Sequence, residues 1–172
     1  MKDEEASTDQ NANEGAGTAA ASSLSLSQRE IGKLMHEALS RINDVSQLDE
    51  VLREAREGSI GKDEEWDTIA SRIKEGFRNP LVASWFREGN TVYNECGIAS
   101  ISEKDGLPCV LRPDRVVMTD DSITVIDYKF GHPCRDYDNQ VRRYMNLMKQ
   151  MYPGHNVKGH IWYIMLGKIQ NV

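Results

Sequence analysis

The hydrophobic period of the chain changes near residue 90, and this change constrains the fold more than any other feature. From Ser27 to Gly89, apolar residues recur three and four positions apart, which is the spacing of one helix face. From Thr91 onward they mostly alternate with polar residues, which is typical of half-buried strands. A chain with helices first and a sheet afterwards is expected to form one α+β or α/β domain.

Four helices are expected before the change. The first begins at a capping box, in which Ser27 caps the helix and Glu30 reaches back. The second ends at Gly58, and the fourth opens at Asn79-Pro80 and stops at Gly89. Apolar stripes define the first three: Ile31, Leu34, Met35, Ala38 and Ile42; Leu48, Val51, Leu52 and Ala55; Trp66, Ile69, Ala70 and Ile73.

Three strands, a helix and a last strand are expected after the change. A tight polar turn at 119–122 joins the second and third strands, and Pro153-Gly154 closes the helix. The result is a central mixed sheet. The expected elements cover, in chain order, strands at about 91–101, 110–118 and 123–130, a helix at about 136–152, and a strand at 157–166.

The N-terminal segment differs in composition from the rest of the chain. Met1 to Ser23 contain no Val, Ile, Leu, Phe, Tyr or Trp. Such a segment buries too little apolar surface to offset its ordering entropy. Residues 1–26 are therefore interpreted as a disordered linker or arm, and residues 27–172 as the folded domain. A linker in this place suggests a tether to something larger.

Composition excludes several classes of protein. The chain has no run of 18 apolar residues, which excludes a membrane span. Its acidic start lacks the apolar core of a secretory signal. Three widely spaced cysteines make a disulfide scaffold or a four-cysteine zinc site unexpected, so a reducing cytoplasm fits best.

Charge is unevenly distributed. Lys and Arg total 21 and Asp and Glu total 27, a net charge of −6. Residues 129–172 carry seven positive and two negative side chains, a net charge of +5. An acidic chain does not coat DNA broadly, but a local basic strip can bind phosphate. The alternative interpretation of the strip is a solvated helix face.

Two carboxylates are expected to face each other in the hairpin. Asp127 and Lys129 share one face of their strand because side chains alternate. If Met118 pairs with Ile123 across the turn, Asp114 lies opposite Asp127, with Cβ atoms about 4.5–5.5 Å apart. Like charges in such a place need a cation, or one of the two takes up a proton. Their oxygen atoms suit Mg²⁺ or Mn²⁺. The alternative is that these charges are solvent-facing or protect a sheet edge.

Four motifs occur in an order that resembles a known family. They are Gly32-Lys-Leu-Met-His36, Arg112-Pro-Asp114-Arg-Val116, Val125-Ile-Asp127-Tyr-Lys-Phe-Gly131 and Gln140-Val-Arg-Arg-Tyr144. Together they resemble the RecB-like nuclease domain of the PD-(D/E)XK superfamily. That domain ends ATP-dependent bacterial helicase–nucleases of the RecB and AddA type, whose motor is a UvrD/Rep-family helicase. The resemblance covers about Ser27 to Leu166.

The resemblance implies a fold, an activity and partners. The fold is a restriction-endonuclease-like αβββαβ core with a mixed central sheet and extra N-terminal helices. The activity is that of an Mg²⁺-dependent deoxyribonuclease of the exodeoxyribonuclease V type, with Mn²⁺ able to substitute, in double-strand-break repair and recombination. The partners are DNA, preferably single-stranded, the helicase domain of the same parent chain, and a second helicase–nuclease subunit.

The resemblance also assigns a metal site. Asp114, Asp127, the carbonyl of Tyr128 and the imidazole of His36 would bind the metal. Lys129 would orient the attacking water and stabilise the developing charge. The alternative for His36, which lies at the margin of an apolar stripe, is that it is simply packed.

Five further residues have weaker assignments. Glu95 matches a catalytic glutamate on the first core strand of the family. It would lie behind the direct metal ligands or near a second metal ion, and the alternative is an ordinary surface position. Gln140 and Tyr144 lie one helical turn apart and would line the DNA-binding side. Tyr144 could instead belong to the core. Arg142 and Arg143 would contact phosphates or could be solvated.

Departures from the family pattern limit the cofactors. The chain lacks the four-cysteine cluster that holds an iron–sulfur centre in related members, so no such cluster is expected. It also lacks a Walker A sequence, so no nucleotide is expected. Two rival functions remain: a stand-alone structure-specific or restriction-type endonuclease, which the His36 motif disfavours, and a catalytically degenerate DNA-binding module, which intact Asp114, Asp127 and Lys129 disfavour.

Overall fold

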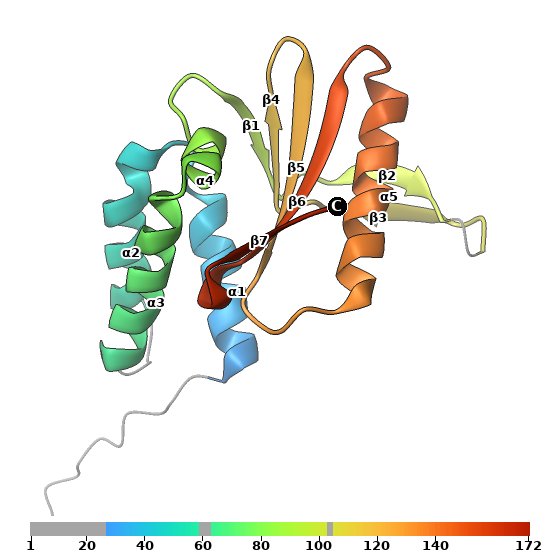
Figure 1. Ribbon diagram of the computed structural model, residues 1–172. Coiled ribbons are helices and arrows are strands. Elements are labelled where there is room, and N and C mark those ends of the chain that lie inside the picture. The colour runs from blue at the N-terminus through green and yellow to red at the C-terminus, as the bar shows by residue number, and fades with distance from the viewer. Residues whose placement is uncertain (1–26, 59–62, 103–104) are drawn as a thin grey trace, which may run out of the picture.

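The computed structural model describes residues 27–58, 63–102 and 105–172 (Figure 1). The expected arm at 1–26 lies outside these residues. The helices are α1 (Gln28–Ser40), α2 (Leu48–Glu57), α3 (Asp63–Phe77), α4 (Pro80–Trp85) and α5 (Arg135–Met151), with short 3₁₀ helices η1 (Val45–Gln47) and η2 (Ile164–Leu166). The strands are β1 (Thr91–Asn94), β2 (Ile98–Ile101), β3 (Pro108–Leu111), β4 (Arg115–Met118), β5 (Ser122–Lys129), β6 (Asn156–Tyr163) and β7 (Lys168–Asn171).

A mixed five-stranded sheet forms the centre of the described residues. Its order is β1-β4-β5-β6-β7, and β2 and β3 form a separate two-stranded hairpin. β5 and β6 are parallel, and the other neighbours are antiparallel. A parallel pair needs a crossover connection, which α5 supplies. The mixed α+β fold predicted from the sequence is confirmed, and it is consistent with a restriction-endonuclease-like architecture.

Helices cover both faces of this sheet (Figure 1). α1 to α4 pack on the face that carries Val117, Ile126 and Trp162. α5 packs on the opposite face, against Val125 and Ile161. Because side chains alternate along β5, Asp127 and Lys129 share the α5 face with Val125. None of the described helices is long and apolar enough to cross a membrane.

Two local predictions are confirmed in detail. The α1 capping box is present: the Glu30 backbone N–H donates to Ser27 Oγ, and the Ser27 backbone N–H donates to the Glu30 carboxylate. In the β4–β5 hairpin, Met118 pairs with Ile123. That register was the premise for placing Asp114 opposite Asp127.

Two of the expected strands are interrupted, so their predicted spans are wrong. The span at 91–101 divides because Glu95 has φ +46°, a left-handed conformation that ends the extended backbone. β1 then joins the large sheet, whereas β2 pairs with β3. The span at 110–118 divides at 112–114, where Pro113 has no N–H to donate to a ladder.

Two other boundaries also differ from prediction. α4 ends at Trp85 rather than near Gly89, because the Trp85 carbonyl accepts hydrogen bonds from a buried arginine. β6 ends at Tyr163 rather than Leu166. Gly167, at φ +59°, then reverses the chain into β7, an edge strand that the sequence analysis missed.

Arg115 on β4 is fully buried and joins the helical layer to the sheet. Its Nη1 donates to the Ile42 carbonyl and its Nη2 to the Asn43 carbonyl, each at 2.7 Å. Its Nε and Nη2 donate to the Trp85 carbonyl at 3.1 and 2.9 Å. Nη1 also reaches Oδ1 of Asn94 at 3.0 Å. This network fixes the ends of β1 and β4, and the candidate site lies beside those ends.

Candidate active site

Asp114 lies just before β4, where three parts of the chain meet. Its Oδ2 accepts a hydrogen bond from the Tyr128 backbone N–H at 2.6 Å. Its Oδ1 lies 3.2 Å from Nδ1 of His36. Its backbone carbonyl accepts from the Glu95 N–H at 2.9 Å. The carboxylate is thus oriented by β5 and α1, and the main chain of Asp114 positions the segment that follows β1.

His36 reaches the site from α1. Its side chain is half-buried, and its ring lies near the rings of Tyr128 and Phe130, with centroid separations of 6.2 and 5.7 Å. Burial opposes protonation, but the hydrogen bond to Asp114 and the charge of that carboxylate outweigh it, so the pKa of His36 is raised. The imidazole is therefore held by a carboxylate rather than simply packed against apolar side chains.

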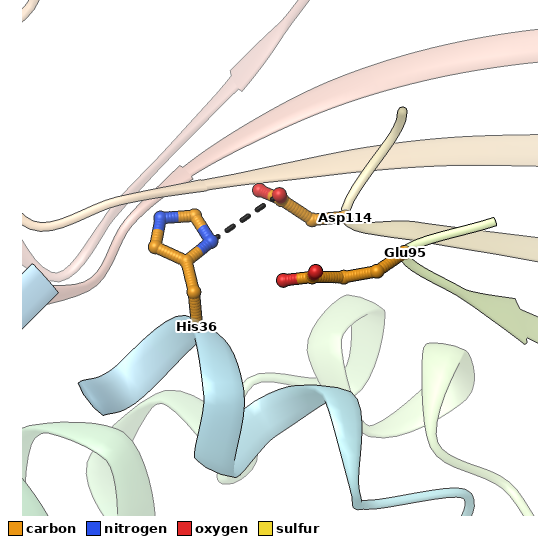
Figure 2. Close-up of side chains that lie close together, drawn as sticks. All are labelled: His36, Glu95 and Asp114. Atoms are coloured by element: carbon orange, nitrogen blue, oxygen red, sulfur yellow. Dashed lines mark ion pairs between the residues drawn. The ribbon is translucent and has the colours of Figure 1, made fainter. Parts of the chain in front are cut away.

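Glu95 completes a cluster with these two residues. Figure 2 shows the side chains of His36, Glu95 and Asp114 pointing toward one another from α1, the segment after β1 and the segment before β4. One ligand atom from each lies within 4.8 Å of the others. The two carboxylates provide the hard oxygen ligands that suit Mg²⁺ or Mn²⁺, and the imidazole adds a nitrogen ligand. Glu95 lies in this cluster although its φ of +46° is unfavourable for a residue with a side chain.

Asp127 and Lys129 lie beside this cluster and form an ion pair with each other. Asp127 is 1% exposed. The last residue pair of the β4–β5 ladder is Arg115 with Ile126, and one step further along this register Asp114 is opposite Asp127. Burial and the charge of Asp114 raise the pKa of Asp127 to about 6, although Lys129 and His36 act in the opposite direction. The sequence-based expectation of two mutually repelling carboxylates agrees with this shift. Asp127 is not itself a member of the three-residue cluster.

Lys129 is held by an aromatic ring that the sequence analysis did not select. The Lys129 Nζ lies 4.6 Å from the ring centroid of Tyr137, on the first turns of α5. A cation over an aromatic face is attracted to it. Tyr137 could have been selected from the sequence because it lies at the start of the helix that follows β5 and crosses back over its end. The ring restricts where the ammonium can point.

Gln140 and Tyr144 interact within the protein. Tyr144 is buried on α5, and its hydroxyl donates to the Arg112 carbonyl at 3.2 Å. Gln140 Nε2 donates to the same hydroxyl at 2.7 Å. This chain of hydrogen bonds ties α5 to the segment that precedes Asp114. Their proposed contact with DNA stays a prediction.

The remaining assigned residues are placed as follows. Arg142 and Arg143 are exposed on α5, and their proposed contacts with phosphates stay a prediction. Tyr128 is buried on the α1 side, and burial raises the pKa of its hydroxyl. Its backbone N–H serves Asp114, and the role of its carbonyl as a metal ligand stays a prediction.

Comparison with protein families identifies the fold's relatives. The family model of the PD-(D/E)XK nuclease superfamily matches residues 11–171. The chain belongs to this superfamily. A comparison with curated proteins found no match. Membership in the PD-(D/E)XK superfamily points to a nuclease that acts on DNA, and its nucleases typically use divalent metals, in agreement with the donor set around Asp114.

Proposed function

We propose that this domain is an Mg²⁺-dependent deoxyribonuclease that hydrolyses phosphodiester bonds at the Asp114 site. The observation that carries the proposal is the convergence of His36, Glu95 and Asp114 beside the buried Asp127–Lys129 pair. A degenerate module would have no use for a donor set and a partly buried lysine in one place, because each costs folding free energy without a ligand.

Each side chain has a distinct role in this proposal. His36, Glu95 and Asp114 hold the metal, and Asp127 and the Tyr128 carbonyl serve as further ligands. When bound, the metal lowers the pKa of a water and neutralises phosphate charge.

The chain's own residues supply the remaining interactions. The Lys129 ammonium donates hydrogen bonds to the attacking water or to a phosphate oxygen as negative charge develops there. Asp127 keeps the ammonium in place through their ion pair. The Tyr128 N–H and His36 fix the rotamer of Asp114, so little reorganisation is needed when substrate arrives.

We propose further that the domain spans 27–172 and works as an exonuclease within a cytoplasmic helicase–nuclease of the RecB or AddA type. Residues 1–26 would tether it to the motor. The motif order supports this context, and so does charge: a net charge of −6 with one short basic strip predicts weak, salt-sensitive binding to DNA. A tethered motor would provide a high local concentration of single strands.

A gel assay with end-labelled DNA tests the proposal and separates its rivals. Linear single-stranded, linear duplex and closed circular substrates are incubated with Mg²⁺ or EDTA. The proposal predicts slow, non-processive, Mg²⁺-dependent degradation, faster on linear single strands and accelerated by the linked helicase with ATP. Cleavage of closed circles would favour the stand-alone endonuclease. Binding without any cleavage would favour the degenerate module.

A further inference from the structure

A groove lies between the β2–β3 hairpin and α5. The hairpin projects from the main sheet on the same side of the molecule as α5 (Figure 1). Its volume is about 550 Å³, within the range of about 300–1,000 Å³ that is usual for sites that take small molecules. Nothing in the proposed hydrolysis uses this groove. It is lined on the hairpin side by residues that include Ser100 and Leu111, and on the α5 side by Arg143, Asn146, Leu147 and Gln150.

The lining combines donors with apolar surface. Arg143 provides a positively charged guanidinium with several N–H donors, and the amides of Asn146 and Gln150 can each donate and accept hydrogen bonds. Leu111 and Leu147 are half-buried and supply apolar contact surface. Among the described residues that line the groove, none is acidic, although the chain as a whole carries a net charge of −6. A ligand with a negative group and a planar, hydrogen-bonding apolar body fits this surface.

Two segments, the end of β3 and helix α5, connect the groove to the candidate active site. Leu111 precedes Asp114 by three residues, a span of at most about 11 Å. Arg143 is next to Tyr144, whose hydroxyl is bonded to the Arg112 carbonyl. A strand that leaves the Asp114 site would therefore need only a few nucleotides to reach Arg143.

We propose that this groove binds an unpaired nucleotide of the DNA strand whose phosphodiester lies at the Asp114 site. The inference rests on the proposed function for the identity of the strand, whereas the contacts follow from the residues that line the groove. Arg143 pairs with a phosphate, the amides of Asn146 and Gln150 contact the edge of the base, and the two leucines contact its face. A base within a duplex is stacked and paired, so it cannot present its face and edge together to such a groove. The groove thereby selects single-stranded DNA.

Fluorescence anisotropy in EDTA tests this binding apart from any cleavage. The full chain is titrated against a labelled thymidine 12-mer, a thymidine dinucleotide and a 12-base-pair duplex at low salt. We expect tightest binding to the single-stranded 12-mer. Arg143→Ala and the double variant Asn146→Ala/Gln150→Ala should each weaken binding of the 12-mer by about tenfold, as the loss of roughly 1.4 kcal/mol of contact energy implies. Arg87→Ala, which removes an exposed charge after α4, is the matched control and should bind like the wild type.

The outcomes separate this inference from the proposed function. Equal binding of duplex and single strand by the wild type, or wild-type affinity in both groove variants, would overturn the inference whatever the cleavage rate. Groove-dependent binding in EDTA without any Mg²⁺-dependent cleavage would support the groove and contradict the proposed hydrolysis. Loss of 12-mer binding in Arg87→Ala as well would show that overall charge rather than the groove is responsible, and would also overturn the inference.

Discussion

The imidazole Nδ1 of His36 lies 3.2 Å from Oδ1 of Asp114, although the two residues come from different structural layers. His36 belongs to the helical layer, whereas Asp114 precedes a strand of the sheet. The same carboxylate accepts the Tyr128 N–H through its other oxygen. The site therefore forms only when the helical layer is docked on the sheet, which couples folding of the whole domain to assembly of the candidate metal centre.

Metal binding should stabilise the folded domain through this cluster. At a Mn²⁺ concentration one hundred times its Kd, the expected gain is about 2.7 kcal/mol, seen as a rise of several degrees in Tm. His36→Gln and Glu95→Gln should each remove most of this shift, because each removes one of the three clustered side chains that are proposed to hold the metal. Glu88→Gln, at an exposed position, is the control and should keep the shift. An identical shift in all four proteins would place the metal elsewhere.

Without metal, stability should fall as the pH rises. The pKa of Asp127 is raised to about 6 in the folded state, so the folded protein binds this proton more tightly than the unfolded chain does. The stabilisation is present near pH 4 and is lost as the pH approaches and passes 6, a change of up to about 3 kcal/mol. The pKa of His36 is also raised, so its contribution is lost in the same direction at slightly higher pH.

Urea denaturation in EDTA from pH 4.5 to 8 measures this dependence. Asp127→Asn should flatten the profile between pH 4.5 and 6.5, and Asp120→Asn, in the exposed turn, should leave it unchanged. Stability of the wild type that rises through this interval, or an unaltered slope in Asp127→Asn, would contradict a raised pKa of Asp127 in the folded state.

Tyr137 should position Lys129 without taking part in the chemistry. The ring face, 4.6 Å from the ammonium, is worth about 0.5–2 kcal/mol. Tyr137→Leu should therefore lower kcat by between about twofold and thirtyfold with little change in KM. Tyr137→Phe keeps the ring and should retain near wild-type kcat. Tm values of both variants that match the wild type would exclude a purely structural role of Tyr137. Equal losses of kcat in Tyr137→Leu and Tyr137→Phe would contradict positioning of Lys129 by the ring.

Arg115 should be essential for stability because its buried guanidinium donates to three backbone carbonyls, those of Ile42, Asn43 and Trp85. Arg115→Lys leaves several of these bonds unmade, and a shorter cation remains buried among them. The expected loss is about 3–5 kcal/mol in the free energy of unfolding, measured by urea titration. Arg87→Lys, at an exposed position, should change it by less than about 0.5 kcal/mol. A comparably small effect at Arg115 would mean that other contacts hold the helices on the sheet.

Local signals explain which parts of the fold could be predicted from sequence. The Ser27–Glu30 capping box depends on residues three positions apart, so the pattern predicted it directly. The Met118–Ile123 pairing was assumed from the short polar turn at 119–122, and the structure has this register. The break at Glu95 could not be read in this way. A glutamate is not a usual left-handed residue, and the partner of its backbone N–H, the Asp114 carbonyl, is distant in the sequence. β7 was missed because a four-residue edge strand carries almost no periodic signal.

In the candidate site too, the residues placed by local strand pairing could be predicted, and those placed by distant packing could not. Asp114, Asp127 and Lys129 could be placed together from the hairpin register, since strand pairing fixes their spacing. His36 was joined to them only by family resemblance, because helix docking determines its distance from Asp114. Tyr137 was missed because its contact with Lys129 depends on how α5 crosses the sheet. Gly159 permits that approach: a Cβ there would lie 2.3 Å from Sδ of Met145.

The most direct test of the central claim is the rate at which Lys129→Ala cleaves an end-labelled single-stranded oligonucleotide. We expect Mg²⁺-dependent cleavage by the wild type, none in EDTA, and a loss of about 10²-fold or more in Lys129→Ala, because the ammonium acts on charge that develops in the transition state. Mn²⁺ binding by this variant at pH 8 should be nearly unchanged, and Lys158→Ala, an exposed lysine on β6, should cleave at the wild-type rate. Wild-type cleavage by Lys129→Ala, or cleavage that persists in EDTA, would contradict a metal-dependent nuclease site at Asp114.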